Sequence, residues 1–217
     1  MLTIVIPTFN AGRSLGTCLG ALDGADLLIV DGGSTDDSVD IARRAGAQVL
    51  IAPRGRGRQL QAGGAAATSD WLLFLHADTQ LGAGWQDAIA RHVAVAPDHA
   101  GFFDLRLDDP AWQARVIERG VRLRTASFAL PYGDQGLLMP RRLYDEVGGF
   151  RPLELMEDVD LVRRLGRRRH RPLGAPALTS ADRWRRDGWL RRSARNLACL
   201  ALYASGVAPN RIARLYR

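Results

Sequence analysis

The chain has 217 residues, 47% of them hydrophobic, which is enough to bury one substantial core but short of two full domains. Its net charge of +7 comes from 30 arginines and no lysine, and it is uneven, because residues 1–162 carry −6 and residues 163–217 carry +13. Cys18 and Cys199 lie far apart without a CxxC pair, so the sequence indicates neither a disulfide framework nor a thiolate metal site, which fits a reducing cytosol.

Apolar, β-branched runs in the first half of the chain predict buried strands at 2–7, 27–31, 48–52 and 71–76. Helix-like stretches separate these runs, at 14–22, 38–45 and 57–68. This alternation predicts an α/β protein with a βαβ sheet. Later in the chain we expect strands at 101–107 and 135–139, and helices at 85–95, 111–126, 188–204 and 209–216.

The residues that end the predicted strands are the first site candidates, since ligands of such sheets bind beyond the carboxyl ends of the strands. The second strand ends in residues 31–36 (DGGSTD). A carboxylate, flexible glycines and hydroxyls in one loop suit the base and ribose of a nucleoside. Helix capping explains residues 34–36 equally well, but it does not explain Asp31.

An arginine and glycine cluster, residues 54–58 (RGRGR), follows the third predicted strand. Backbone amides, the helix dipole and guanidinium groups at such a turn favour a diphosphate. A loosely ordered surface loop is the alternative, and the pattern matches neither a dinucleotide fingerprint nor a P-loop. The interpretation of residues 54–58 as a diphosphate site therefore depends on their position after a predicted strand.

The fourth predicted strand ends in His76-Ala77-Asp78. Alternation along a strand places His76 and Asp78 on one side and Ala77 on the other. A carboxylate and an imidazole on one face can hold Mg²⁺ or Mn²⁺ while diphosphate oxygens complete the shell. A lone histidine is more often structural, so Asp78 is the stronger candidate.

An acidic cluster, residues 157–160 (EDVD), begins a helix-like stretch late in the chain. The helix dipole stabilises carboxylates in a first turn, so capping is one explanation of this cluster. The other is catalytic, because a base that deprotonates an acceptor hydroxyl must be an ionisable group near the cleft. The cluster is the best late candidate for that base.

In this order, the segments resemble the inverting glycosyltransferase family 2, whose members have the GT-A fold. The resemblance rests on residues 4–10 (IVIPTFN), 30–36 (VDGGSTD), 55–63, 74–79 (FLHADT), 133–150 and 157–158. It covers roughly residues 2–165 and is closest to a small bacterial subgroup of short, non-processive members. The implied organisation is a mixed, mostly parallel sheet flanked by helices.

The resemblance implies a nucleotide-sugar half at 1–100, an acceptor half at 101–165, and a basic, mostly helical extension at 166–217 packed on the same domain. The residues implied at the nucleotide-sugar site are Pro7, Thr8, Asn10, Asp31, Gly33, Arg56, Arg58, Gln61 and Ala77. Those implied on the acceptor side are Gly133, Asp134 and Gln135.

The implied reaction is metal-assisted transfer of a sugar with inversion. Glu157 and Asp158 are the implied catalytic pair, in which Asp158 takes the proton of the acceptor hydroxyl, while Asp78 and His76 hold Mn²⁺ or Mg²⁺. Two positions depart from the family's pattern. Gly32 stands where an acidic residue is commoner, which leaves the nucleobase open, and a histidine replaces the first aspartate of the Asp-x-Asp metal motif.

Residues 183–192 (RWRRDGWLRR) interleave tryptophan with arginine, a pattern typical of the boundary between anionic headgroups and acyl chains. We expect peripheral contact with the inner face of the cell membrane and a lipid-linked acceptor. A solvated basic surface is the alternative. Arg183-Trp184 also matches the end of the Gln-x-x-Arg-Trp motif of processive family members, although the glutamine is missing.

Residues 1–10 lack the basic start of a signal peptide, and the apolar run at 197–207 is too short to span a bilayer, so we expect a cytoplasmic protein. A sugar-phosphate nucleotidyltransferase is the nearest other class, but its Gly-Arg loop follows the first strand. A non-catalytic nucleotide-binding or membrane-associated scaffold leaves Asp78 and Asp158 unexplained. No recognition motif accompanies the arginines, so nucleic acid is not an expected partner.

Overall fold

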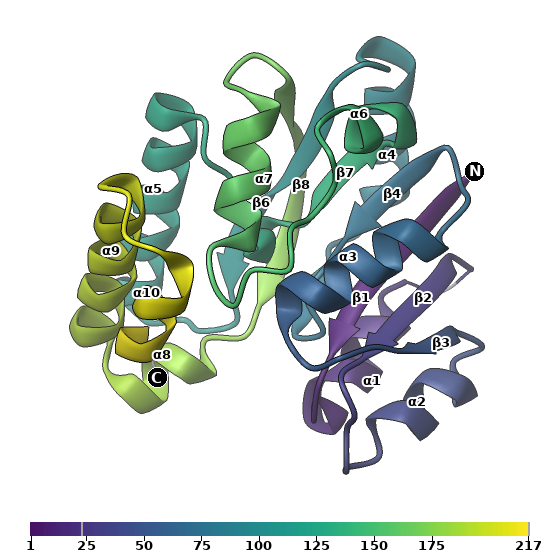
Figure 1. The fold of residues 1–217 in the computed structure, drawn as a ribbon, viewed down its shortest axis with the longest axis horizontal. Helices are drawn as coiled ribbons and strands as arrows, with labels where there is room; N and C mark the ends of the chain where they lie inside the picture. The colour runs from purple at the N-terminus through teal and green to yellow at the C-terminus, as the bar shows by residue number, and fades with distance from the viewer. Residues whose placement is uncertain (23, 217) are drawn as a thin grey trace.

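The computed structural model describes residues 1–22 and 24–216, which form an eight-stranded sheet with helices on both faces (Figure 1). The strand order is β3-β2-β1-β4-β7-β6-β8-β5. The strands are β1 (Leu2–Thr8), β2 (Asp26–Asp31), β3 (Gln48–Ile51), β4 (Trp71–Phe74), β5 (Thr79–Leu81), β6 (Ala100–Leu107), β7 (Leu137–Pro140) and β8 (His170–Thr179).

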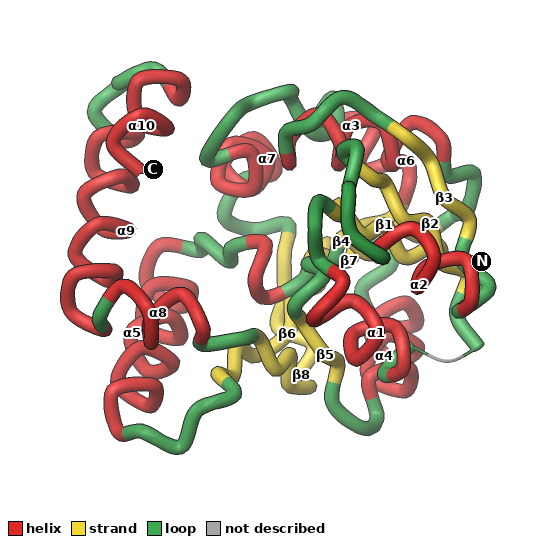
Figure 2. The backbone as a smooth tube through the Cα atoms, turned by 90° about the horizontal axis from the view of Figure 1, so that it is seen from below, coloured by secondary structure: helices red, strands yellow, loops and turns green. Residues whose placement is uncertain are grey.

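Two sets of helices cover the two faces of the sheet, and Figure 2 shows α3, α6 and α7 on the side opposite α1 and α4. The first set is α1 (Gly12–Gly20), α2 (Ser38–Arg44) and α4 (Trp85–Val95). The second set is α3 (Arg56–Ala66), α6 (Arg141–Glu146) and α7 (Glu157–Leu165). Helix α5 (Trp112–Phe128) packs on β6, and a short 3₁₀ helix, η1 (Gly133–Gln135), precedes β7.

Strands β1 to β4 are parallel to one another, as the alternation of strand and helix predicted. The apolar run Ile4, Val5 and Ile6 is fully buried because helices cover both sides of β1. Parallel pairing aligns Thr8 with Asp31, so the loops that follow β1 and β2 emerge at the same edge of the sheet. The candidate site lies at that edge.

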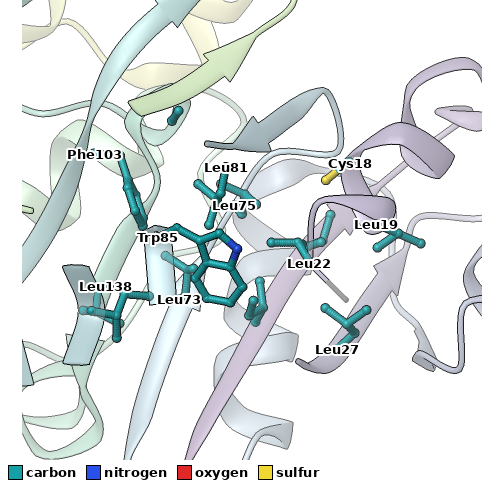
Figure 3. Packing of buried hydrophobic residues seen from close by; sticks show 14 of the residues in the cluster. Cys18, Leu19, Leu22, Leu27, Leu73, Leu75, Leu81, Trp85, Phe103 and Leu138 are labelled. Carbon is teal, nitrogen blue, oxygen red and sulfur yellow. The ribbon is translucent and has the colours of Figure 1, made fainter. Parts of the chain in front are cut away.

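The core on the α1 and α4 face is organised around Trp85, whose indole ring lies among Leu22, Leu73 and Leu75 (Figure 3). Only 5% of Trp85 is exposed, and its Nε1 donates a hydrogen bond of 3.1 Å to the carbonyl oxygen of Ala21. The buried indole N–H is therefore satisfied while the ring fills the core. The packing of Trp85 with Leu73 and Leu75 therefore holds α4 against the end of β4.

The second half of the sheet mixes strand directions and includes a strand that the sequence did not predict. Strand β7 is antiparallel to β4 and β6, β8 is parallel to β6, and β5 is antiparallel to β8. Strand β8 lies inside the segment predicted as a mostly helical extension, and its alternate residues from Leu173 to Thr179 are buried. The sheet thus continues past residue 165, and helices resume at Asp182.

Smaller differences concern the ends of elements and the short helices. Strand β4 ends at Phe74, so His76, Ala77 and Asp78 lie in a turn before β5 and not on a strand. The alternation argument for these residues was therefore wrong. The strand predicted from residue 135 begins at Leu137, and helix α6 was not predicted.

Three helices end the described chain: α8 (Asp182–Asp187), α9 (Trp189–Ala204) and α10 (Pro209–Tyr216). Cys199 of α9 and Ile212 of α10 are buried against Met156 and Val159 at the start of α7. Figures 1 and 2 both show α5 and α9 at the end of the molecule farthest from β3. Within residues 1–22 and 24–216, no helix combines the length and apolarity needed to cross a membrane.

Candidate functional site

A cleft of about 350 Å³ opens where β1 and β4 end and α3 begins. Its walls come from the loop after β1, the start of α3, the turn after β4 and helix α8. The lining residues are Pro7, Thr8, Phe9, Asn10, Ala11, Ser14, Arg54, Gly55, Arg56, Gln59, His76, Ala77, Asp78 and Arg183. Three arginines face one aspartate among them, which favours an anionic ligand.

The loops that follow β1 and β2 are joined by reciprocal hydrogen bonds. The Thr35 N–H donates to Asn10 Oδ1 at 2.9 Å, and the Asn10 N–H donates to Ser34 Oγ at 2.9 Å. Asp31 is 1% exposed, and its Oδ1 accepts from the amides of Gly33 and Ser34 at 2.9 and 2.8 Å. Asp31 is therefore a buried residue that fixes the conformation of the loop after β2.

Gln59 connects the strand ends to α3 from a buried position. Its Nε2 donates to the carbonyl oxygens of Thr8 and Val30, both at 2.7 Å, and its Oε1 accepts from the Gly55 N–H at 3.3 Å. Only 3% of Gln59 is exposed. One side chain thus satisfies two strand-end carbonyls and fixes the turn that carries the arginines.

Gly57 allows the first turn of α3 to approach the segment before α7. A Cβ at this position would lie 2.5 Å from the carbonyl oxygen of Leu153 and 2.7 Å from that of Arg151. No real side chain tolerates such contacts with backbone atoms. This close approach brings Arg56 to the acidic start of α7.

Arg56 forms an ion pair with Glu157, the first residue of α7. The Glu157 side chain is 1% exposed, whereas the arginine is 33% exposed and lines the cleft. Burial raises the pKa of Glu157 above its ordinary value, although the charge of Arg56 acts in the opposite direction. The pair therefore links the buried start of α7 to the cleft.

Asp158, His76 and Gly133 meet behind the cleft, beside a cavity of about 10 Å³ that all three line. The Gly133 N–H donates to Asp158 Oδ2 at 2.8 Å, and the Val159 N–H donates to Oδ1 at 2.8 Å. A Cβ on Gly133 would lie 2.7 Å from His76 Nε2. The missing side chain is what lets the imidazole and the carboxylate share this space.

Opposing effects set the charge states of the two groups. Burial alone would raise the pKa of Asp158, but the charge of Arg56 and the amide donors Gly133 and Val159 lower it below its ordinary value. Burial and the charge of Arg56 lower the pKa of His76 to about 4, although Asp78 and Asp158 oppose that shift. At neutral pH the site therefore holds an ionised Asp158 and an uncharged His76.

The residues predicted to hold a metal supply donors of a suitable kind but few of them. Asp78 and His76 both line the cleft, and the imidazole is uncharged, as a ligand must be. Within the part of the chain that the structure describes, no three histidine, cysteine or acidic side chains are arranged to hold an ion. The two donors fit Mg²⁺ or Mn²⁺ only if a bound ligand supplies further oxygens.

A family model described as Glycosyl transferase family 2 matches residues 3–130, more than half of the chain. The chain belongs to this family. The matched region contains the cleft loops, Arg56 and the His76–Asp78 turn, whereas Glu157 and Asp158 lie beyond it.

Relatives found by sequence agree with membership of glycosyl transferase family 2. An uncharacterized glycosyltransferase of Mycobacterium bovis is 42% identical over 84 residues, which are 38% of this chain and 38% of the relative. A PGL/p-HBAD biosynthesis glycosyltransferase of the same species is 35% identical over 111 residues, 46% of this chain and 43% of the relative. The match thus spans less than half the length of these relatives.

The expected GT-A fold is confirmed by solved structures. S. aureus TarS in complex with UDP-GlcNAc superposes with a TM-score of 0.64 at 14% identity, covering 82% of this chain and 58% of TarS. Glucosyl-3-phosphoglycerate synthase of Mycobacterium tuberculosis, in complex with Mn²⁺, UDP and phosphoglyceric acid, gives 0.58 at 18% identity, covering 83% and 68%. At these identities the likeness concerns the fold.

The structure separates the predicted site residues of this family 2 protein into three groups. Lining the cleft are Pro7, Thr8, Asn10, Arg56, His76, Ala77 and Asp78. Behind it, beside the small cavity, are His76 again with Gly133, Glu157 and Asp158. The predicted residues that line neither space are Asp31, Gly33, Arg58, Gln61, Asp134 and Gln135.

Three residues of the last group have clear positions of their own. Gln61 and Arg58 are exposed on α3, so the glutamine that reaches the cleft is Gln59 and not Gln61. Gln135 is 3% exposed, and its Nε2 donates to the carbonyl oxygen of Phe103 at 3.1 Å. Gln135 is therefore a buried brace under the loop.

Arg54, the first residue of the predicted arginine and glycine cluster, also lines the cleft, and so does Arg183, which the sequence placed only in the stretch expected at a membrane. The Arg54 guanidinium lies 4.0 Å from the centre of the Phe9 ring, a cation–π contact. Arg183 enters from α8, since the Ser180 N–H donates to the Asp78 carbonyl oxygen at 3.2 Å and brings the end of β8 beside the His76–Asp78 turn. The Arg-Trp match in the sequence was the signal for Arg183.

Proposed function

We propose that this family 2 protein transfers a sugar from a nucleoside diphosphate donor to an acceptor hydroxyl with inversion at the anomeric carbon. One observation carries the proposal. The cationic cleft and the ionised Asp158 adjoin across a single residue, His76, which lines both the cleft and the small cavity. The cleft can thus hold a leaving group that gains negative charge, and Asp158 next to it can act as the base that gains a proton.

In the proposed reaction the diphosphate lies against Arg54, Arg56 and Arg183. As the bond to the anomeric carbon breaks, these cations stabilise the negative charge that develops on the departing nucleoside diphosphate. Arg56 is held at the cleft by its pairing with Glu157, so little reorganisation accompanies the reaction. Because His76 is uncharged at neutral pH, the positive charge that faces the substrate comes from the arginines.

Asp158 takes the proton of the acceptor hydroxyl as its oxygen attacks the anomeric carbon from the face opposite the diphosphate. The amides of Gly133 and Val159 fix both carboxylate oxygens, which aims the free lone pairs. We assign Gly133 and Asp134 to the acceptor side, because they precede β7 next to Asp158. One displacement of this kind inverts the anomeric centre.

Asp78 and His76 are the residues that would hold a divalent metal together with oxygens of the donor. When bound, Mn²⁺ or Mg²⁺ neutralises diphosphate charge and improves the leaving group. The M. tuberculosis synthase was solved in complex with Mn²⁺ and with Mg²⁺, in both cases together with UDP, which supports this part of the proposal. We further propose a cytoplasmic enzyme with a lipid-linked acceptor.

The test is release of nucleoside diphosphate from a panel of UDP-, GDP- and dTDP-sugars, with Mn²⁺ or Mg²⁺ and then with EDTA. We expect release from one donor class, loss with EDTA, and a drop of about 10²–10⁴-fold in kcat for Asp158→Asn. Asp78→Asn should act in the same direction, whereas the exposed Asp87→Asn on α4 serves as its matched control. Absence of binding and turnover with every donor would overturn the proposal.

A further inference from the structure

Helix α5 carries an apolar stripe that faces solvent. Trp112 is 70% exposed, Val116 is 52% exposed and Leu123 is 67% exposed. Spacings of four and seven residues place these three side chains on one face of the helix, with the exposed Arg119 among them. Side chains of this size rarely face water together without a partner.

Helix α9 lies at the same end of the molecule as α5 (Figures 1 and 2). It presents a second exposed apolar row. Leu190 is 88% exposed and Leu197 is 65% exposed, seven residues apart and therefore on one face. The tryptophans of the 183–192 stretch are not part of this surface. Trp184 and Trp189 pack against Leu107 and Ala114, so their expected role as membrane anchors is not supported.

The exposed charge on α5, α9 and α10 has one sign. Exposed arginines stand on all three helices, namely Arg119 and Arg122 on α5, Arg191 on α9, and Arg211 and Arg214 on α10. Helices α9 and α10 contain no acidic residue. The single acid of α5, Glu118, is 1% exposed and pairs inward with Arg106 and Arg115.

We propose that α5 and α9 dock this end of the protein on a membrane surface rich in anionic headgroups. The apolar rows enter the boundary between headgroups and acyl chains, while the arginines remain at headgroup level. A second copy of the chain is a poor occupant, because it would bring equally positive helices together. Nucleic acid would match the arginines but leave the apolar rows in water. The inference rests on this surface and not on the proposed reaction.

The experiment is flotation of the full chain with vesicles of phosphatidylcholine alone and of phosphatidylcholine mixed with phosphatidylglycerol. We expect binding that requires phosphatidylglycerol and weakens with salt. Trp112→Ser with Leu123→Ser should lower the partition coefficient at least about tenfold, since two large side chains leave the bilayer. Arg119→Gln with Arg122→Gln should lower it roughly fivefold per arginine.

Matched pairs elsewhere on the surface are the controls. Ile51→Ser with Val95→Ser removes two apolar side chains that are 63% and 81% exposed, and Arg43→Gln with Arg44→Gln removes two exposed charges of α2. Both pairs should float like the wild type. The proposal is overturned if the α5 variants also float like the wild type, or if the free protein is a dimer that Trp112→Ser with Leu123→Ser converts to a monomer.

Discussion

Arg56 and Glu157 form an ion pair across 101 residues of sequence, and only the arginine end of the pair reaches the cleft. Glu157 is fully buried, so it cannot touch a donor while that pairing holds. Its effect on chemistry must pass through Arg56, which makes it a positioning residue. Gly57 is what permits the approach, because a Cβ there would collide with the carbonyl of Leu153.

Glu157→Gln should therefore weaken both the fold and donor binding. Loss of the charged hydrogen bond lowers the free energy of unfolding by about 1–3 kcal/mol. Freed from its anchor, Arg56 moves and the KM for the donor rises more than kcat falls. Urea denaturation and initial rates measure the two effects. Asp145→Asn is the control, since that carboxylate is 60% exposed and should change stability by less than about 0.5 kcal/mol.

Gly133→Ala should disturb the space shared by His76 and Asp158. The added Cβ would lie 2.7 Å from His76 Nε2 and 3.3 Å from Asp158 Oδ2, which costs about 1–3 kcal/mol of stability and lowers kcat. Gly120→Ala on exposed α5 meets no atom within 4 Å and should instead stabilise by up to about 1 kcal/mol. Thermal denaturation of both variants checks the opposite signs.

The first half of the fold was predictable because its strands are continuous apolar runs and its loops end them clearly. Strand β8 was not, since Pro172, Gly174 and Pro176 within it argue against a strand. Both prolines pair with β6 on one side of β8, whereas β5 pairs on the other side only with residues 177–179, so that side has no strand partner at either proline. A proline on a free edge forfeits no ladder hydrogen bond.

The site residues that lie just after the strands could be predicted from the sequence. Those on a helix were harder to predict, because the sequence had to show which face of the helix is buried. Helix α3 consists largely of arginine, glutamine, glycine and alanine, so no apolar stripe marks its buried face. Choosing between Gln59 and Gln61 therefore needed the three-dimensional structure. The contact of Gly133 with His76 joins segments 57 residues apart, and nothing in the local sequence signals it.

Gln59→Ala and Gln61→Ala test that assignment directly. Removing Gln59 leaves the carbonyls of Thr8 and Val30 without their donor in a buried position, which costs about 1–3 kcal/mol of unfolding free energy. Gln61 is exposed, so its removal should change stability by less than about 0.5 kcal/mol. Equal midpoints of urea denaturation for the two variants would contradict the bracing role of Gln59.

His76 should make the fold sensitive to mild acid. The unfolded chain binds a proton on this residue near pH 6.5, whereas the folded chain does so only near pH 4. The contribution of the uncharged His76 to the free energy of unfolding is therefore fully present above about pH 6.5. It is lost between pH 6.5 and pH 4, and the loss is on the order of 2–3 kcal/mol. Unfolding free energies from pH 7 to pH 4 should fall less steeply in His76→Gln. Parallel curves for the two proteins would refute this origin.

Arg183 reaches from α8 into the cleft that we propose as the donor site, and its replacement should separate binding from folding. The side chain is exposed but lines the cleft, so Arg183→Gln should leave the midpoint of thermal unfolding nearly unchanged. Loss of one charge-assisted contact with a diphosphate weakens donor binding by about 1.5–3 kcal/mol, a rise of roughly 10- to 150-fold in donor Kd. Titration with the nucleoside diphosphate alone measures this, because it needs no acceptor.

Arg186→Gln, on the same helix and 74% exposed, should bind like the wild type. Equal affinity in both variants would remove α8 from the donor site and leave Arg54 and Arg56 as its cations.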